Sequence, residues 1–340
     1  GWPIAIKVET NSSPAVGDID GDGDLEIVVC ADRVYAWHDD GDELVDGDND
    51  AQTWGVLNTL GSAYVSHAAL APIDGSAGLD IIAASRDTKQ VFVFKHDGTV
   101  VSGWPRAVEN TLRAGMVVGD LDNNGVPEII AVDEKGVIYA WHTNGTELID
   151  GDANPATPGV FYRMTGCTFH YSTPCVANMD GDSALELVVG SQGDQVFVFN
   201  GNGSINPGFP YALTSDIAGS PAIGDVDANG DMEIAVFEYS GNFRVLNHDG
   251  TQQVFQFFQN SLFFGPSPVL ANVTGDAKLE MFVASKNGRI YGMNHLGTFL
   301  PGWPVFYNTS GQYTESSPII ADVDGDGAPD IVLGDESRFM

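Results

Sequence analysis

Short apolar runs separated by glycine turns recur along the whole chain. After an acidic stretch comes a run such as Ile27, Val28 and Val29, followed by a segment in which aromatic residues alternate, as at Tyr35 and Trp37. Alternation with a period of two, bounded by glycines, indicates β-strands. A hairpin glycine then follows at six equivalent positions, namely Gly41, Gly98, Gly145, Gly203, Gly250 and Gly297. The pattern predicts an all-β chain of short strands joined by tight turns.

The acidic stretch before the apolar run has oxygen-bearing side chains at every second position. In the first copy they are Asp18, Asp20, Asp22, Asp24 and Glu26. Alternating oxygens on a glycine-rich loop suit a hard cation that takes about six to eight oxygen ligands. We expect side-chain ligands at loop positions 1, 3 and 5, a carbonyl ligand at position 7 and a closing carboxylate at position 9.

This loop returns around the chain as an internal repeat. The position-9 carboxylates are Glu26, Asp80, Glu128, Glu186, Glu233, Glu280 and Asp330, with gaps of 54, 48, 58, 47, 47 and 50 residues. Four short strands in a repeat of about 40–50 residues are typical of a β-propeller blade. We therefore predict one seven-bladed propeller of four-stranded blades spanning residues 1–340, with the acidic loops between first and second strands. The blades fall at about 12–64, 65–113, 114–171, 172–219, 220–264, 265–315 and 316–340.

Repeated D-x-D-x-D-G with a position-9 carboxylate and an apolar strand resembles the FG-GAP/VCBS repeats of integrin-α-type propellers. The resemblance extends over essentially the whole chain. It implies calcium-binding loops and a role in adhesion or assembly outside the cell.

Five of the seven loops keep an oxygen ligand at every required position. Besides residues 18–26, these loops contribute Asp120, Asp122, Asn124, Val126 and Glu128; Asn178, Asp180, Asp182, Ala184 and Glu186; Asp225, Asp227, Asn229, Asp231 and Glu233; and Asp322, Asp324, Asp326, Ala328 and Asp330. Asp and Asn also cap their own backbone in turns without metal, which is the alternative explanation. Several facing carboxylates repel unless they are neutralised, so we predict about five Ca²⁺ ions.

Two loops depart from the pattern. The second has Pro72 at position 1 and Ser76 at position 5, leaving Asp74 and Asp80, and we expect it to be empty. The sixth has Asn272, Thr274, Asp276 and Glu280 but Lys278 at position 7, which makes it a weaker candidate.

A second acidic cluster follows the hairpin in the first and third repeats. It comprises Asp46, Asp48 and Asp50 in one and Asp150, Asp152 and Asn154 in the other. The spacing permits Ca²⁺, but no position-9 carboxylate follows. A solvated loop is the favoured interpretation.

Aromatic and charged residues gather in the connections between blades. The candidate ligand face comprises Tyr64, His67, Arg113, His170, Tyr171, Tyr313 and Glu315, which we expect around the central channel on the face opposite the acidic loops. The alternative is that these aromatic residues pack between blades.

The two ends of the chain carry complementary parts of one blade. Gly1-Trp2-Pro3 matches the start of a fourth strand, as at Gly103-Trp104-Pro105, whereas residues 316–340 supply a blade that lacks one. We predict that residues 1–8 complete that blade, because closure removes an open sheet edge.

Charge narrows the possible partners and location. The chain has 47 acidic and 14 basic residues, for a net charge of −33, which argues against nucleic acid and anionic membranes. No apolar run reaches the roughly 18–20 residues of a membrane span, and three cysteines do not make a disulfide framework. We expect an extracellular or cell-surface protein in a mature form.

The sequence favours binding over catalysis. It has no H-E-x-x-H, G-x-S-x-G, P-loop or C-x-x-C motif. The leading hypothesis is a non-catalytic calcium-stabilised propeller that binds proteins or glycans or assembles with copies of itself. The alternative is a calcium-dependent, lyase-like enzyme acting on polysaccharides at the channel mouth.

Overall fold

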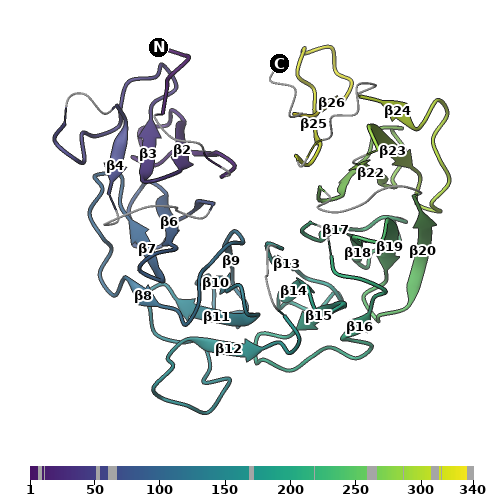
Figure 1. Cartoon of the computed structure of the whole chain (residues 1–340), viewed down its shortest axis with the longest axis horizontal. Helices are drawn as coiled ribbons and strands as arrows, with labels where there is room; N and C mark the ends of the chain where they lie inside the picture. The colour runs from purple at the N-terminus through teal and green to yellow at the C-terminus, as the bar shows by residue number, and fades with distance from the viewer. Residues whose placement is uncertain are drawn as a thin grey trace. The chain divides into compact units, whose positions relative to one another are not determined.

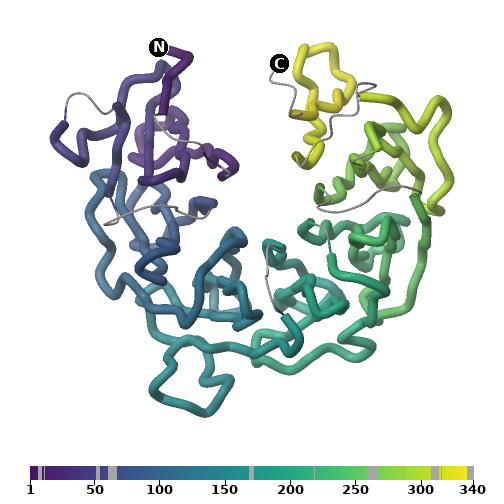
Figure 2. The backbone as a smooth tube through the Cα atoms, in the orientation of Figure 1, coloured from purple at the N-terminus to yellow at the C-terminus, as the bar shows by residue number. Residues whose placement is uncertain are grey.

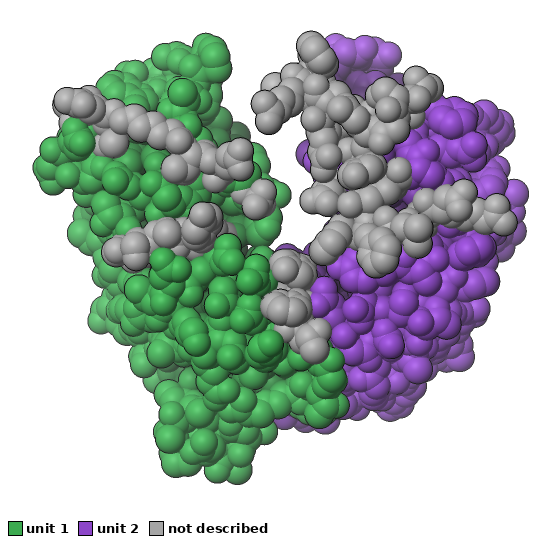
Figure 3. Space-filling model, in the orientation of Figure 1, with its two compact units in different colours: residues 1–120, 124–171 green, residues 121–123, 172–340 purple. Residues whose placement is uncertain are grey.

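The computed structural model describes residues 1–6, 10, 12–50, 54–59, 67–167, 172–217, 219–258, 266–285, 287–307, 314 and 316–334. The chain divides into two compact units (Figure 3). The first comprises Gly1–Asp120 and Asn124–Tyr171, and the second comprises Leu121–Asn123 and Ser172–Met340.

The first unit contains three four-stranded antiparallel sheets, and in each of them strand order follows chain order (Figure 1). The strands of the first sheet are β1 (Ala15–Gly17), β2 (Glu26–Cys30), β3 (Val34–Trp37) and β4 (Val56–Asn58). Those of the second are β5 (Ala69–Ala71), β6 (Asp80–Ser85), β7 (Gln90–Phe94) and β8 (Arg106–Ala107). Those of the third are β9 (Val117–Gly119), β10 (Glu128–Val132), β11 (Val137–His142) and β12 (Val160–Arg163).

The second unit repeats this arrangement (Figure 2 follows the chain through it). Its fourth sheet has β13 (Cys175–Ala177), β14 (Glu186–Ser191), β15 (Gln195–Phe199) and β16 (Tyr211–Ala212). The fifth has β17 (Ala222–Gly224), β18 (Glu233–Phe237), β19 (Asn242–Leu246) and β20 (Gln252–Phe257). The sixth has β21 (Val269–Ala271), β22 (Glu280–Ser285), β23 (Arg289–Met293) and β24 (Val305–Phe306), and the seventh has β25 (Ile319–Ala321) and β26 (Asp330–Val332). We call each sheet a blade, numbered one to seven along the chain.

In five of the six four-stranded blades the second strand is largely apolar after its opening carboxylate, and both of its faces are covered; in the first blade, β2 alternates between buried and half-buried positions. β6, β10, β14, β18 and β22 are buried over their whole lengths. Their apolar side chains pack between neighbouring blades: Val28 and Ala36 of the first blade share a core cluster with Ile81 and Phe94 of the second. The all-β prediction and its order of strands are confirmed.

The alternating aromatic residues of the third strands stack on one another. Tyr35 and Trp37 have ring centroids 5.7 Å apart, and Tyr139 and Trp141 have centroids 5.3 Å apart. The tryptophan of a Gly-Trp-Pro segment packs edge-on against such a stack, as Trp104 does on Trp141 at 5.8 Å. The stacks therefore serve as platforms for the segment that leads into the fourth strand.

Hydrogen bonds join adjacent blades at the start of their first strands. The N–H groups of Thr173, Ser220 and Ser267 each donate to the hydroxyl of the equivalent serine one blade further on, at 2.9 Å. In the first unit the N–H of Ser13 donates to Nδ1 of His67 over the same distance. In the second unit these positions thus form a ladder of contacts, which we call the Ser-Pro ladder.

Residues 1–6 lie against the first blade. Trp2 packs edge-on to Trp37 at 5.9 Å and donates from Nε1 to the carbonyl of Asp39, while Ile4 and Ile6 pack on the same cluster. Residues 7–9 and 335–340 fall outside the described residues, so completion of the last blade by residues 1–8 stays a prediction. In the described part of the chain, no helix has the length and apolar character needed to cross a membrane.

Candidate metal-binding loops

The position-9 carboxylate opens each second strand and is anchored from inside the loop. Glu26, Glu186 and Glu233 have no exposed surface. One oxygen of this carboxylate accepts the backbone N–H of the residue at position 2, over 2.7 to 3.1 Å, in the loops that begin at residues 18, 72, 178, 225, 272 and 322. This repeated bond fixes the carboxylate at the base of the loop.

Position 2 is a structural element that the sequence interpretation missed. Ile19, Met179 and Val226 are buried between two ligand positions and supply the anchoring N–H. The sequence does carry a pattern that indicates this role, because an apolar residue stands at position 2 in all seven loops. Its burial turns the flanking Asp and Asn side chains outward.

The side chains at positions 1, 3 and 5 cap the backbone of their own loop. Asn229 donates its N–H to Asp225 at 3.0 Å and to Asp227 at 3.2 Å, and Asp231 donates to Asn229 at 2.7 Å. Equivalent bonds occur at Asp18, Asp120, Asn178 and Asp322. The capping turns are therefore present, but each oxygen retains lone-pair capacity for a cation.

Acidic ligand atoms converge above the buried carboxylate. Within each of the sets Asp18–Asp20–Asp22, Asp180–Asp182–Glu186 and Asp225–Asp227–Glu233, one ligand atom per residue lies within 4.8 Å of the others. Burial, with Asp227 and Asp225 nearby, raises the pKa of Glu233 to about 7, and burial likewise raises the pKa of Glu186. A positive charge at these places would relieve both effects.

The second oxygen of the buried carboxylate distinguishes the loops. In the fourth and fifth blades, Oε1 of Glu186 and of Glu233 is buried and has no hydrogen-bond partner among the described residues. In the first blade Oε1 of Glu26 lies 3.2 Å from Nδ1 of His38, and in the third blade Oε1 of Glu128 lies 2.9 Å from Nδ1 of His142. In the third loop Asp120 accepts the N–H of Gly125 and Asn124 accepts the N–H of Val126. Asp122 lies in the segment Leu121–Asn123, which belongs to the second unit.

A lysine lies at each of the two loops with incomplete ligand sets: Lys95 reaches the second loop from the hairpin after β7, and Lys278 belongs to the sixth loop itself. In the second blade Lys95 Nζ lies 2.6 Å from Asp74, and with the Ser76 contacts it lowers the pKa of Asp74 to about 2. In the sixth blade Lys278 Nζ lies 2.9 Å from Nε2 of His295, and Thr274 donates from Oγ1 to Glu280 at 3.1 Å. A side-chain ammonium thus supplies positive charge in the loop that we predict to be empty.

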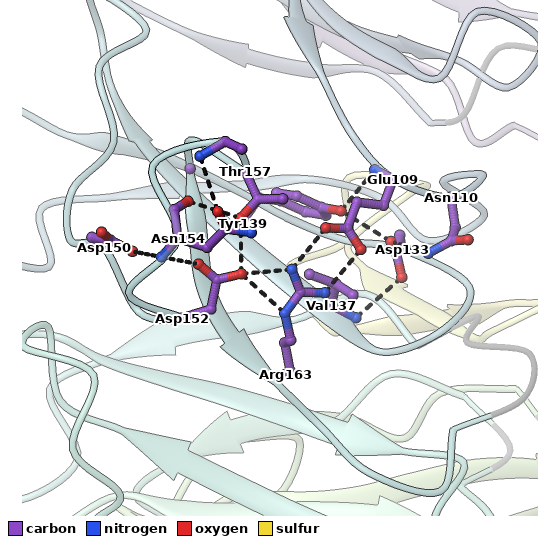
Figure 4. Close-up of polar contacts among 12 residues, drawn as sticks. Glu109, Asn110, Asp133, Val137, Tyr139, Asp150, Asp152, Asn154, Thr157 and Arg163 are labelled. Atoms are coloured by element: carbon purple, nitrogen blue, oxygen red, sulfur yellow. Dashed lines mark hydrogen bonds and ion pairs between the residues drawn. The ribbon is translucent and has the colours of Figure 1, made fainter.

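Arginines enter the second acidic clusters. Arg163 donates to Asp152 from Nε at 3.1 Å and from a terminal nitrogen at 2.6 Å, and it forms a two-point pair with Glu109 (Figure 4). Arg33 pairs with Asp48 in the equivalent place in the first blade. The side chains of Asp48 and Asp152 are 9% and 12% exposed, so ion pairing rather than solvation neutralises these two carboxylates.

The structure describes two members of the predicted ligand face, and each of them makes a hydrogen bond within the protein. His67 accepts the N–H of Ser13 at Nδ1, and burial lowers its pKa. Arg113 donates from Nε to Glu134 at 2.8 Å. Tyr64, His170, Tyr171, Tyr313 and Glu315 lie outside the described residues.

A family model for FG-GAP-like repeats matches residues 178–236 and 272–333. The chain therefore contains FG-GAP-like repeats. No curated protein matches the sequence.

Solved structures with low identity share the fold. Sqt1 of Saccharomyces cerevisiae superposes with a TM-score of 0.60 at 12% identity, covering 93% of this chain and 79% of Sqt1. BBS1N, solved in complex with ARL6DN, gives 0.52 at 11% identity, covering 90% and 83%. The Vibrio cholerae biofilm matrix protein Bap1 gives 0.50 at 13% identity, covering 95% and 84%. Together with the repeated sheets, these similarities identify a β-propeller fold.

Proposed function

We propose that this FG-GAP-like propeller is a non-catalytic scaffold, stabilised by calcium, that binds an extracellular protein or glycan or assembles with copies of itself at the cell surface. The propeller fold and its repeats support a role in protein interaction. Calcium, secretion and the nature of the partner are the parts that we propose beyond that.

The observation that carries the calcium proposal is the pair of unpartnered buried oxygens at Glu186 and Glu233. A buried carboxylate oxygen without a partner is costly, and a cation bound by the surrounding oxygens would remove that cost. The donor set consists of carboxylate, amide and carbonyl oxygens, which suits Ca²⁺. When bound, the ion supplies charge neutralisation and fixes the loop.

The residues that would hold the ions are those at positions 1, 3, 5, 7 and 9 of the five complete loops. Five divalent ions would bring +10, so the net charge would change from −33 to about −23. Extracellular calcium modules bind with dissociation constants of about 10⁻⁴–10⁻³ M, and we expect this range.

Thermal unfolding with and without chelator tests the proposal. We expect excess EDTA to lower the melting temperature and Ca²⁺ to restore it, because the ions bind the folded state only. Asp182→Ala and Asp326→Ala should each remove one ion in metal analysis, whereas Asp74→Ala should leave the stoichiometry unchanged. An unchanged melting temperature in EDTA would overturn the calcium role.

The lyase-like alternative gains no support from the described mouth residues. A lyase needs a base and cationic groups facing an acidic polysaccharide, but Arg113 is paired with Glu134 and His67 accepts a backbone N–H. The net charge of −33 also repels an anionic substrate. Ultraviolet assays for unsaturated sugar products on acidic polysaccharides should therefore remain negative.

A further inference from the structure

One hairpin position reaches toward the acidic loop in several blades. It lies three residues before the turn glycine and is occupied by His38, Lys95, His142, Asn200, Asn247 and Asn294. In all six hairpins its N–H donates to the carbonyl four residues on, at 2.8 to 2.9 Å. The backbone is thus the same, and the side chains can be compared directly.

The side chain at this position determines what meets the loop carboxylates. Lys95 places its ammonium on Asp74, which shows that a group from this position can stand where positive charge is needed. Asn200 and Asn247 instead turn back to the hydroxyls of their own hairpins at 2.9 and 2.7 Å. Their blades are the two in which Oε1 of the buried glutamate has no hydrogen-bond partner among the residues that the structure describes.

His38 and His142 present a nitrogen at that point. The ligand atoms of Asp20, Glu26 and His38 all lie within 4.8 Å of one another. Two ligand atoms about 2.0–2.2 Å from a shared ion, at angles of about 90–110°, lie about 2.8–3.6 Å apart. The observed Nδ1 to Oε1 separations, 3.2 Å at His38 and 2.9 Å at His142, fall within that range.

We propose that two of the five complete loops, those of the first and third blades, are mixed nitrogen–oxygen sites that take a transition-metal dication in place of Ca²⁺, with Nδ1 of His38 and of His142 as ligands. This inference rests on the proposed cation-binding role of the loops. Imidazole suits zinc, nickel and related ions, whereas Ca²⁺ takes oxygen ligands. The neutral ring binds through Nδ1 and carries its proton on Nε2.

The proposal divides the loops into three kinds within one chain. In the fourth and fifth blades no described nitrogen meets the buried glutamate's Oε1, so these loops, with that of the seventh blade, are calcium sites. His248 of the fifth blade lies instead with Nδ1 3.5 Å from Asp231. Loops of the first and third blades select for ions that accept nitrogen. The second blade carries its own ammonium at Lys95. In the first five blades, the side chain three residues before the hairpin glycine decides which kind of positive charge each of these loops receives.

Titration of the full chain with Co²⁺ in excess Ca²⁺ tests this, because Co²⁺ gives a visible absorption band that reports its ligands. We expect the band to appear in the wild type and to be displaced by Zn²⁺. His38→Asn copies the side chain of the fourth and fifth blades and should reduce Co²⁺ affinity at its site by about tenfold or more. The double variant with His142→Asn should lose the band.

His96→Ala is the matched control, because His96 is an exposed hairpin histidine one position away from Lys95. It should leave the spectrum unchanged. No band in the wild type, or the same band in the double variant, would overturn the inference. Calcium-dependent melting of the wild type separates the two proposals. If the Co²⁺ result fails while the melting temperature still depends on Ca²⁺, only the inference fails; if the melting temperature does not depend on Ca²⁺, the calcium role fails.

Discussion

In the buried side chain of Glu233, Oε2 accepts the N–H of Val226, whereas Oε1 has no hydrogen-bond partner in the described part of the chain. Because burial raises its pKa from 4.5 to about 7, the contribution of this group to stability is present at low pH and is lost as pH rises through about 7. At pH 8 without a cation, the buried charge should therefore oppose folding.

Glu233→Gln is predicted to change sign with calcium. In EDTA at pH 8 the substitution should raise the melting temperature, because it removes the buried charge. In saturating Ca²⁺ it should lower the melting temperature, because a charged ligand is lost. Glu26→Gln, whose Oε1 is already paired with His38, should gain less in EDTA. A loss of equal size in both conditions for Glu233→Gln would contradict the prediction.

At the scale of residues, the sequence predicts which side chains are candidate ligands better than it predicts which side chains touch one another. Alternating Asp and Asn oxygens identify candidate ligands because their spacing follows from the chain itself. Whether Lys95 meets Asp74, or Asn200 turns away from Glu186, depends on side-chain rotamers and on the approach of the hairpin. Those are set by packing, which one sequence does not show.

At the scale of elements, the Ser-Pro ladder joins the segments that precede the first strands of neighbouring blades. Ser267 accepts from Ser220 and donates to Ser317, both at 2.9 Å. Ser267→Ala should lower the free energy of unfolding by about 1 kcal/mol, because the Ser220 N–H loses its acceptor. Ser267→Thr keeps the hydroxyl and should be nearly neutral. Urea unfolding of the three proteins checks this, and equal losses in both variants would show that the hydroxyl is not what matters.

A carboxyl pair joins the β14–β15 hairpin to the connection before β17. Burial, together with Asp194, which shares a hydrogen bond with it, raises the pKa of Asp216 to about 6. The folded state thus holds this proton more tightly than the unfolded chain, so stability is full below about pH 4 and falls as pH rises through about 6.

Asp216→Asn should flatten that part of the pH profile. Denaturant unfolding at fixed Ca²⁺ between pH 4 and 7 measures the slope. Asp249→Asn is the contrast, because the hydroxyl and N–H of Thr251 lower the pKa of Asp249 and stability from that group is lost as pH falls. A wild-type slope in Asp216→Asn would contradict the assignment.

At the scale of elements, the order and direction of strands followed from the repeat, but their lengths did not. β8, β16 and β24 have two residues each, whereas β20 has six. The fourth segment is held by contacts of its tryptophan or phenylalanine with other strands rather than by its own alternation. Period-two patterns are therefore weakest where the outer strands begin and end.

Closure of the ring within the chain is a prediction for the whole molecule. Trp2 already packs on Trp37, so deleting residues 1–8 would destabilise the first blade whichever way the ring closes. Short-range crosslinking with mass spectrometry is more decisive. We expect links between residues 1–12 and 316–334 within monomers, and links found only between differently labelled copies would favour strand exchange.

The net charge of −33 predicts how salt and calcium should interact. Without calcium, exposed carboxylates of the loops repel one another, and raising the ionic strength from about 0.01 M to 1 M shortens the screening length from about 30 Å to 3 Å. Salt should therefore raise the melting temperature strongly in EDTA and little in saturating Ca²⁺. Salt does not screen the buried carboxylates of Glu186 and Glu233, so the difference in melting temperature between EDTA and saturating Ca²⁺ should become smaller but not vanish.

Tetramethylammonium chloride separates screening from ion binding, because its bulky cation cannot replace a dication among loop oxygens. If salt acts equally with and without calcium, charge repulsion is not what the ions relieve. If high salt removes the difference in melting temperature between EDTA and Ca²⁺ completely, the two buried carboxylates do not require a bound cation.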